Sequence, residues 1–114
     1  MADLHSLCNL YYENNDDVNE KIDIKEFSYD MTSILLASGL DLDRTNLFLQ
    51  SSVPMHSELY WYLSSIVPHH WLNKMIQYKT KKKRGSTVGL YTYPILMAAD
   101  IVLYNPEFVP VGHD

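Results

Sequence analysis

Asp100 is the side chain whose sequence surroundings most clearly require a chemical partner. It stands inside the apolar run of residues 95–103, where an unpaired carboxylate would be costly to bury. Helical spacing of i, i+4, i+7 and i+11 puts four side chains on one stripe: Tyr93, Met97, Asp100 and Tyr104. Such a stripe could bind a flat aromatic ligand, such as indole, whose single N–H donates to the carboxylate.

Asp100 also has an ordinary structural interpretation. A backbone amide or a basic side chain could donate to its carboxylate, and the rest of the stripe would then be core. The small residues Ala98 and Ala99 lie off the stripe and would allow close packing behind it. Periodicity alone leaves both interpretations open.

Two further patterns could contact a nucleotide. The segment 79–86 reads KTKKKRGS, and its lysines, Lys81 among them, could fold around phosphates with Gly85 as a hinge. Gly112 and Asp114 could approach a nucleotide through the glycine backbone and hold a ribose hydroxyl through the carboxylate. A solvated loop and a bare turn are the respective alternatives.

The histidines and the cysteine carry weaker signals. His69 and His70 are adjacent and diverge on a helix, and the five histidines form no His-x-x-x-His pair. We therefore expect no metal site in this segment. A Cys8 nucleophile with His5 as its base lacks any accompanying oxyanion-hole signature.

Composition and charge limit the class of protein. The 114 residues carry a net charge of -5, with ten acidic and three basic residues in the first 50. This acidity argues against nonspecific nucleic-acid binding. No apolar run reaches the roughly 18 residues of a membrane span, and no secretory signal is visible. We expect a soluble intracellular protein.

Apolar spacing predicts helices separated by turns. One begins at Ile24 and ends before Gly39, whose position suits a left-handed cap. A second opens at residues 51–54, where serines could cap it, and stops near Pro68. A shorter helical segment covers 71–78. In the stretch 89–104, Pro94 is expected near a helix start, and Asn105-Pro106 ends the helix.

Short apolar runs between these helices predict buried strands at 46–50 and 108–111, and residues 2–7 suggest the end of a strand running into a loop. Helices alternating with such strands indicate an α/β fold with parallel strands and intervening helices. Ligands gather at the carboxyl ends of strands in such folds.

Five blocks of the sequence, in order and in register, resemble tryptophanyl-tRNA synthetases of the bacterial type, which are class I enzymes. They are ADLHSL (2–7), LFLQSSVPMHSEL (47–59), MIQYK (75–79), YPILMAADI (93–101) and VPVGHD (109–114). The resemblance implies a partial Rossmann-like nucleotide-binding domain. It implies that residues 1–114 are part of a catalytic domain, with the HIGH-like motif before them and the KMSKS-like loop and anticodon-binding region after them.

The resemblance also implies roles for individual residues. Asp100 would accept the indole N–H, Tyr93 would hold the amino group of tryptophan, and His5 would lie near both substrates. The side chains lining the indole pocket would be Met97, Val109 and Val111. Lys81 would reach the ATP phosphates, whereas Gly112 and Asp114 would meet the ribose.

The implied activity is ATP-dependent activation of L-tryptophan and its transfer to tRNA(Trp). ATP and Mg²⁺ would be required, the parent protein would be a homodimer, and its compartment would be the cytoplasm, a mitochondrion or a plastid. The segment alone would be inactive, because adenylyl transfer needs several elements at once. The alternative is a noncatalytic amino-acid-binding or interaction module derived from the same fold.

Overall fold

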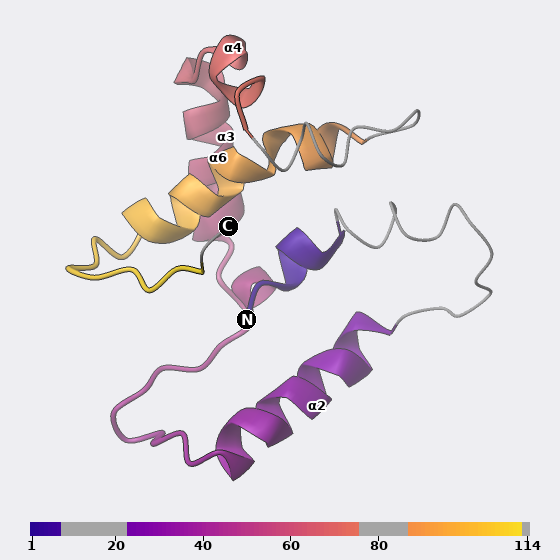
Figure 1. Cartoon of the computed structure of the whole chain (residues 1–114), viewed down its shortest axis with the longest axis vertical. Helices are drawn as coiled ribbons and strands as arrows, with labels where there is room; N and C mark the ends of the chain where they lie inside the picture. The colour runs from indigo at the N-terminus through magenta and orange to yellow at the C-terminus, as the bar shows by residue number, and fades with distance from the viewer. Residues whose placement is uncertain (8–22, 76–86, 113–114) are drawn as a thin grey trace. The chain divides into compact units, whose positions relative to one another are not determined.

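The computed structural model describes residues 1–7, 23–75 and 87–112. The chain divides into two compact units, Met1–Val53 and Pro54–Asp114. The first contains helix α2, and the second contains α3, α4 and α6 (Figure 1). Cys8, Lys81 and the rest of the basic segment lie outside the described residues, as do His113 and Asp114.

Helix α2 spans Ile24–Ala37, as the sequence predicted. It begins where Asp23 accepts hydrogen bonds from the backbone of Lys25 at 2.8 Å and of Glu26 at 3.4 Å, which satisfies otherwise unpaired N–H groups. It ends in a Schellman motif, in which Gly39 has a φ of 93° and its N–H donates to Leu36. The predicted left-handed glycine cap is therefore confirmed.

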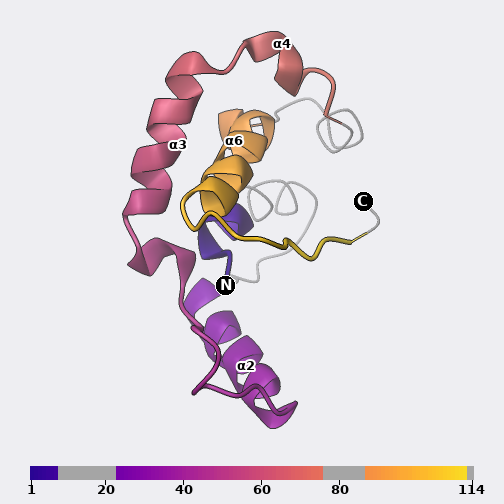
Figure 2. The ribbon, with the colours of Figure 1, turned by 90° about the vertical axis from the view of Figure 1, so that its left-hand side faces the viewer.

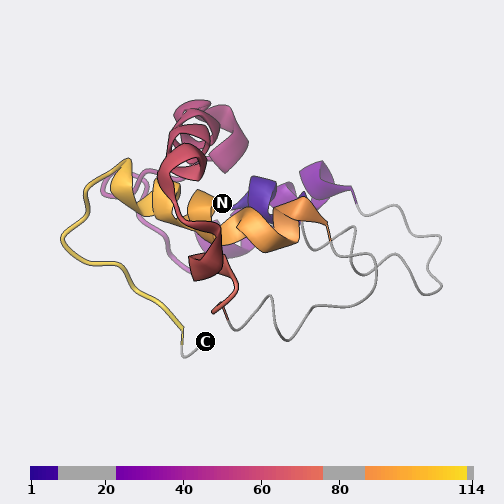
Figure 3. The ribbon, with the colours of Figure 1, turned by 90° about the horizontal axis from the view of Figure 1, so that it is seen from above.

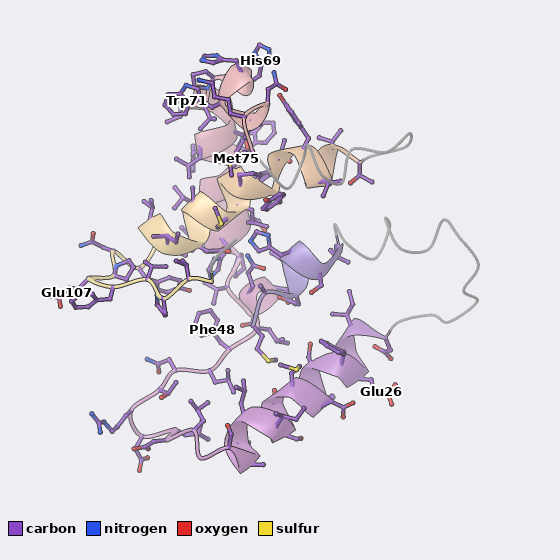
Figure 4. All side chains as sticks on the ribbon, in the orientation of Figure 1. Glu26, Phe48, His69, Trp71, Met75 and Glu107 are labelled. Atoms are coloured by element: carbon purple, nitrogen blue, oxygen red, sulfur yellow. The ribbon has the colours of Figure 1, made fainter. Side chains whose placement is uncertain are left out.

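The apolar face of α2 is exposed within the described residues. Phe27 and Ile34 are each 61% exposed, and no residue of α2 is buried. Side chains project from the helix on all sides in Figure 4, where Glu26 marks its first turn. The periodicity thus predicted the helix correctly, whereas the burial that usually accompanies it is not seen here.

The predicted strand at 46–50 is not observed. Residues 45–49 have no regular structure, and Gln50–Ser52 form the 3-10 helix η1. The N-terminal amine of Met1 donates to Phe48 at 2.6 Å, and the Gln50 N–H donates to Met1 at 2.8 Å. Hydrogen bonds from one residue to residues j and j+2 of another segment are the pattern of parallel pairing. It goes no further because residues 3–7 are helical, not the predicted strand end and loop.

Helix α3 spans Met55–Ile66 and α4 spans His69–Leu72. The predicted serine caps of α3 are wrong: Pro54 occupies the N-cap, and its carbonyl accepts from Ser57 and Glu58. Val67 is extended at the end of α3, as expected of a residue that precedes proline. Helix α4 begins two residues before the predicted start, and His69 and Trp71 project from it in Figure 4.

Helix α6 spans Val88–Val102 and begins at Thr87, whose hydroxyl accepts from the Leu90 N–H at 3.1 Å. This start is earlier than predicted, so Pro94 lies inside the helix and not in its first turn. Proline has no N–H to donate to the carbonyl four residues before it. The local capping at Thr87 and the burial of Pro94 accompany this exception.

The core of the second unit forms where α6 packs against α3, with α4 touching α6. Figure 2 shows α3 and α6 side by side. Leu90, Ile95 and Ala99 of α6 are buried, as is Leu72 of α4. Ala99 has no exposed surface, which agrees with the close packing expected behind the stripe. The hydroxyls of Tyr60 and Thr92 add a hydrogen bond of 2.9 Å between α3 and α6.

After α6 the chain reverses direction, as Figures 1 and 3 show. Asn105 has a φ of 45° at this reversal, a left-handed conformation that asparagine tolerates better than most residues. The predicted strand at 108–111 is not observed, and Phe108 is 85% exposed. A strand requires a second extended segment to hydrogen-bond with, and the described residues offer this segment none.

None of the described residues is therefore in a strand, and the predicted α/β alternation is seen there as helices alone. Among the same residues, no helix combines the length and apolarity needed to cross a membrane.

Replacing Ala99 with leucine should destabilise the second unit. Ala99 has no exposed surface, so the added side chain would meet packed neighbours, and overpacking of this kind costs about 1–3 kcal/mol. Ala37→Leu is the matched control, because Ala37 is exposed in the last turn of α2. Urea denaturation of both variants would measure the difference. Equal free energies of unfolding would contradict the packing described for Ala99.

Candidate functional site

The carboxylate of Asp100 is hydrogen-bonded to the imidazole of His56. Asp100 lies in the last turns of α6 and His56 in the first turn of α3. His56 Nδ1 is 2.6 Å from Asp100 Oδ1. The His56 side chain is 4% exposed, whereas that of Asp100 is 26% exposed. Asp100 thus has the basic partner that its structural interpretation required, and it still reaches the surface.

The second nitrogen of the same imidazole contacts Tyr104. His56 Nε2 is 2.8 Å from the Tyr104 hydroxyl, and the two rings are tilted by 48° with centroids 5.4 Å apart. His56 therefore joins two members of the predicted stripe. We call this group of His56, Asp100 and Tyr104 the α3–α6 relay.

The other two members of the stripe lie on α6. Met97 is 43% exposed and Tyr93 is half-buried. Burial raises the pKa of the Tyr93 phenol above its ordinary value of 10.0, because desolvation penalises the charged form. Tyr93 therefore stays a neutral hydroxyl, able to donate and accept hydrogen bonds.

Other predicted site residues follow α6. Val109 and Val111 are 43% and 80% exposed, and Gly112 is also exposed. They lie on the returning segment, on which Figure 4 labels Glu107. The hydrogen bonds of Asp100 and Tyr104 given above lead to α3 and not to this segment. Lys81 and Asp114 lie outside the described residues.

His5 belongs to the first unit, in the helical residues 3–7, and is half-buried there. Nearby in the sequence, Asp3 accepts hydrogen bonds from the backbone of Ser51 at 3.0 Å and from its hydroxyl. Partial burial alone would raise the pKa of Asp3, but the hydrogen bonds from Ser51, together with smaller contributions from the backbone N–H groups of Asp3 and Leu4, outweigh it and hold the pKa below 3.8. The bonds favour the ionised carboxylate.

Sequence reasoning missed the role of His56. On its own, a histidine near the start of a helix carries no signal. Its spacing to Leu59 and Leu63 is i, i+3 and i+7, which places it on the inward face of α3. A polar residue on an inward face needs a hydrogen-bond partner. Asp100, among apolar neighbours, needs one as well. That shared need is the signal that could have paired them.

All of residues 1–114 match the model of the class I tRNA synthetases for W and Y. The chain belongs to this family.

Curated relatives narrow the resemblance. The chain is 44% identical over its whole length to the "Tryptophan--tRNA ligase" of Fusobacterium nucleatum, of which it covers 33%. It is 49% identical to the chloroplastic/mitochondrial "Tryptophan--tRNA ligase" of Arabidopsis thaliana, over 75% of the chain and 22% of the relative. The chain thus spans a third or less of these two proteins. The predicted resemblance to tryptophanyl-tRNA synthetases is confirmed.

Solved structures of tryptophanyl-tRNA synthetases are also similar to the chain. The chain superposes with a TM-score of 0.81 on the tryptophanyl-tRNA synthetase of Campylobacter jejuni complexed with ADP and tryptophan, at 33% identity over 99% of the chain and 34% of that structure. The enzyme of Mycoplasma pneumoniae gives 0.83 at 38% identity over 98% of the chain and 31% of that structure. The fold of the chain is therefore that of the corresponding part of these enzymes.

Ser51→Ala should raise the pKa of Asp3 toward 3.8, because the variant loses the hydroxyl that favours the ionised carboxylate. A lowered pKa stabilises the fold above 3.8, and the benefit is lost as pH falls. The variant should therefore lose less stability in acid than the wild type. NMR titration of Asp3 measures the shift. Ser33→Ala, on exposed α2, is the control, and an unchanged Asp3 pKa in Ser51→Ala would contradict the assignment.

Proposed function

We propose that the chain is part of the catalytic domain of a tryptophan-tRNA ligase. Its reaction would join the carboxylate of L-tryptophan to the α-phosphorus of ATP with release of pyrophosphate. Transfer of the tryptophanyl group to the 3′ end of tRNA(Trp) would follow. The observation that carries this proposal is the carboxylate of Asp100, held on α6 by a buried histidine in a chain whose relatives bear that name.

Recognition of tryptophan would depend on the stripe of α6. A carboxylate accepts a hydrogen bond from the indole N–H. It rejects rings that lack a donor, because such a ring would leave the carboxylate without that hydrogen bond. Tyr93, a neutral hydroxyl, would accept from the amino group of the substrate. Apolar contact with the ring would come from Met97, Val109 and Val111, and His5 would lie near the bound substrates.

Activation would depend on positioning and charge. Lys81 would stabilise the negative charge that develops on the ATP phosphates, and Gly112 and Asp114 would hold the ribose through backbone approach and a hydroxyl contact. The substrate carboxylate attacks once it is aligned with the α-phosphorus, so binding both substrates in register is most of the catalysis. The similar Campylobacter jejuni structure, complexed with ADP and tryptophan, supports the binding of an adenine nucleotide and of tryptophan.

Mg²⁺ would accompany ATP, as the family implies. Within the described ranges, no group of three or more His, Cys, Asp or Glu side chains could hold a metal ion. A homodimeric parent protein remains part of the proposal. So does a cytoplasmic or organellar location, supported by the name of the Arabidopsis relative.

Asp100→Asn should reduce kcat/KM for tryptophan by roughly 10- to 100-fold, because an amide can present its NH₂ to the indole N–H in place of an acceptor. Tryptophan-dependent exchange of pyrophosphate into ATP by the full-length protein measures this loss. Asp30→Asn is the matched control, since Asp30 is exposed on α2. An unchanged kcat/KM for tryptophan in Asp100→Asn would refute the role of Asp100. If the full-length wild type lacks the exchange activity, the noncatalytic binding module takes its place.

Lys81→Ala should lower kcat for pyrophosphate exchange by roughly 100-fold or more, as expected when one charge-stabilising donor is removed. The KM for tryptophan should change little, because Lys81 is assigned to ATP. Lys74→Ala, outside the basic segment, is the control. Ordinary exchange by Lys81→Ala, with a loss in Lys82→Ala, would move the phosphate role by one residue.

A further inference from the structure

His56 is a buried histidine whose two ring nitrogens both contact side chains of the predicted stripe. Nδ1 meets Asp100 at 2.6 Å and Nε2 meets Tyr104 at 2.8 Å. The residue is 3% exposed, and its partners are 44 and 48 positions away in the sequence. A ring fixed at both nitrogens and closed in by helices has little freedom to turn.

The hydrogens of the α3–α6 relay follow from the chemistry of its members. An ionised carboxylate only accepts, so Nδ1 carries a hydrogen and donates it to Asp100. In the neutral imidazole Nε2 then accepts from the Tyr104 hydroxyl. The carboxylate thus sets the tautomer, and the Tyr104 hydroxyl, which can donate or accept, holds the other nitrogen and with it the orientation of the ring. This is how an outer hydrogen-bond partner orients a ligating side chain elsewhere in proteins.

Orientation of Asp100 matters because its carboxylate can accept about four hydrogen bonds in different directions. One short bond to a rigid, buried donor fixes the plane of the carboxylate. The side chain remains 26% exposed, so a fixed acceptor reaches the surface. Without the donor, the carboxylate could rotate about its side-chain bonds, and a hydrogen bond to a ligand would lose its alignment.

We propose that His56 is a positioning residue for tryptophan selection. It fixes the Asp100 carboxylate for the indole N–H, and Tyr104 fixes His56 in turn. The inference rests on the proposed function, because it assigns the ligand of Asp100 to tryptophan. It adds α3 to a specificity site whose other predicted members in the second unit lie on α6 and on the segment after it.

The test is the ratio of kcat/KM for tryptophan to that for its benzothiophene isostere, β-(3-benzothienyl)alanine, in pyrophosphate exchange by the full-length protein. Sulfur replaces N–H in the isostere, so the ratio reports the hydrogen bond to Asp100. A purely structural role for His56 would lower both values together and leave the ratio unchanged. His56→Ala should lower the ratio at least 10-fold, and His70→Ala, on the exposed surface of α4, should not.

Two milder variants keep the test valid if His56→Ala does not fold. The amide N–H of His56→Asn can replace Nδ1–H, so this variant should recover part of the ratio. Tyr104→Phe keeps the ring but removes the hydroxyl and should lower the ratio by a smaller factor. Unchanged ratios in His56→Ala and Tyr104→Phe, with a selective wild type, overturn the positioning role and leave the proposed function intact. A wild type without tryptophan-dependent exchange overturns the proposed function, and the inference falls with it.

Discussion

The need to satisfy a half-buried carboxylate determines how the second unit is built. Asp100 follows the buried Ala99 on α6, and an acid in that position must be hydrogen-bonded. The donor is His56, which is itself buried and polar and needs a partner for its other nitrogen. Each residue supplies the hydrogen-bond partner that the other needs, and the start of α3 is thereby joined to the end of α6. Leu90 and Ile95 are buried at other turns of α6.

Helices could be predicted from the sequence because their signals are local. The period of Ile24, Phe27 and Met31 and the glycine at position 39 specify α2 without reference to any other segment. Local signals also have limits. Thr87 starts α6 early enough to place Pro94 inside it, and a rule about proline at helix starts predicted the opposite. Capping and packing together outweighed that rule.

Strands and the relay could not be predicted in the same way, because both depend on distant residues. Residues 46–50 have the composition of a buried strand. The parallel pairing given above for their backbone is with a single residue, Met1. The chemistry of Asp100 was evident from its apolar neighbours, but its donor lies 44 positions earlier. Sequence showed that a partner was needed, and the arrangement of α3 and α6 showed which one.

Pro94 divides α6 into segments that can exchange their amide hydrogens independently. Residue 94 has no amide hydrogen, so the Leu90 carbonyl lacks its usual helical donor and the hydrogen-bond ladder is interrupted there. The turns before it are tied to α4 through Tyr91, whose hydroxyl donates to the His69 carbonyl, and to α3 through Thr92. The turns after it are tied to α3 through Asp100. Opening of the first segment, a local event of lower free energy than global unfolding, therefore leaves the acceptor carboxylate in place.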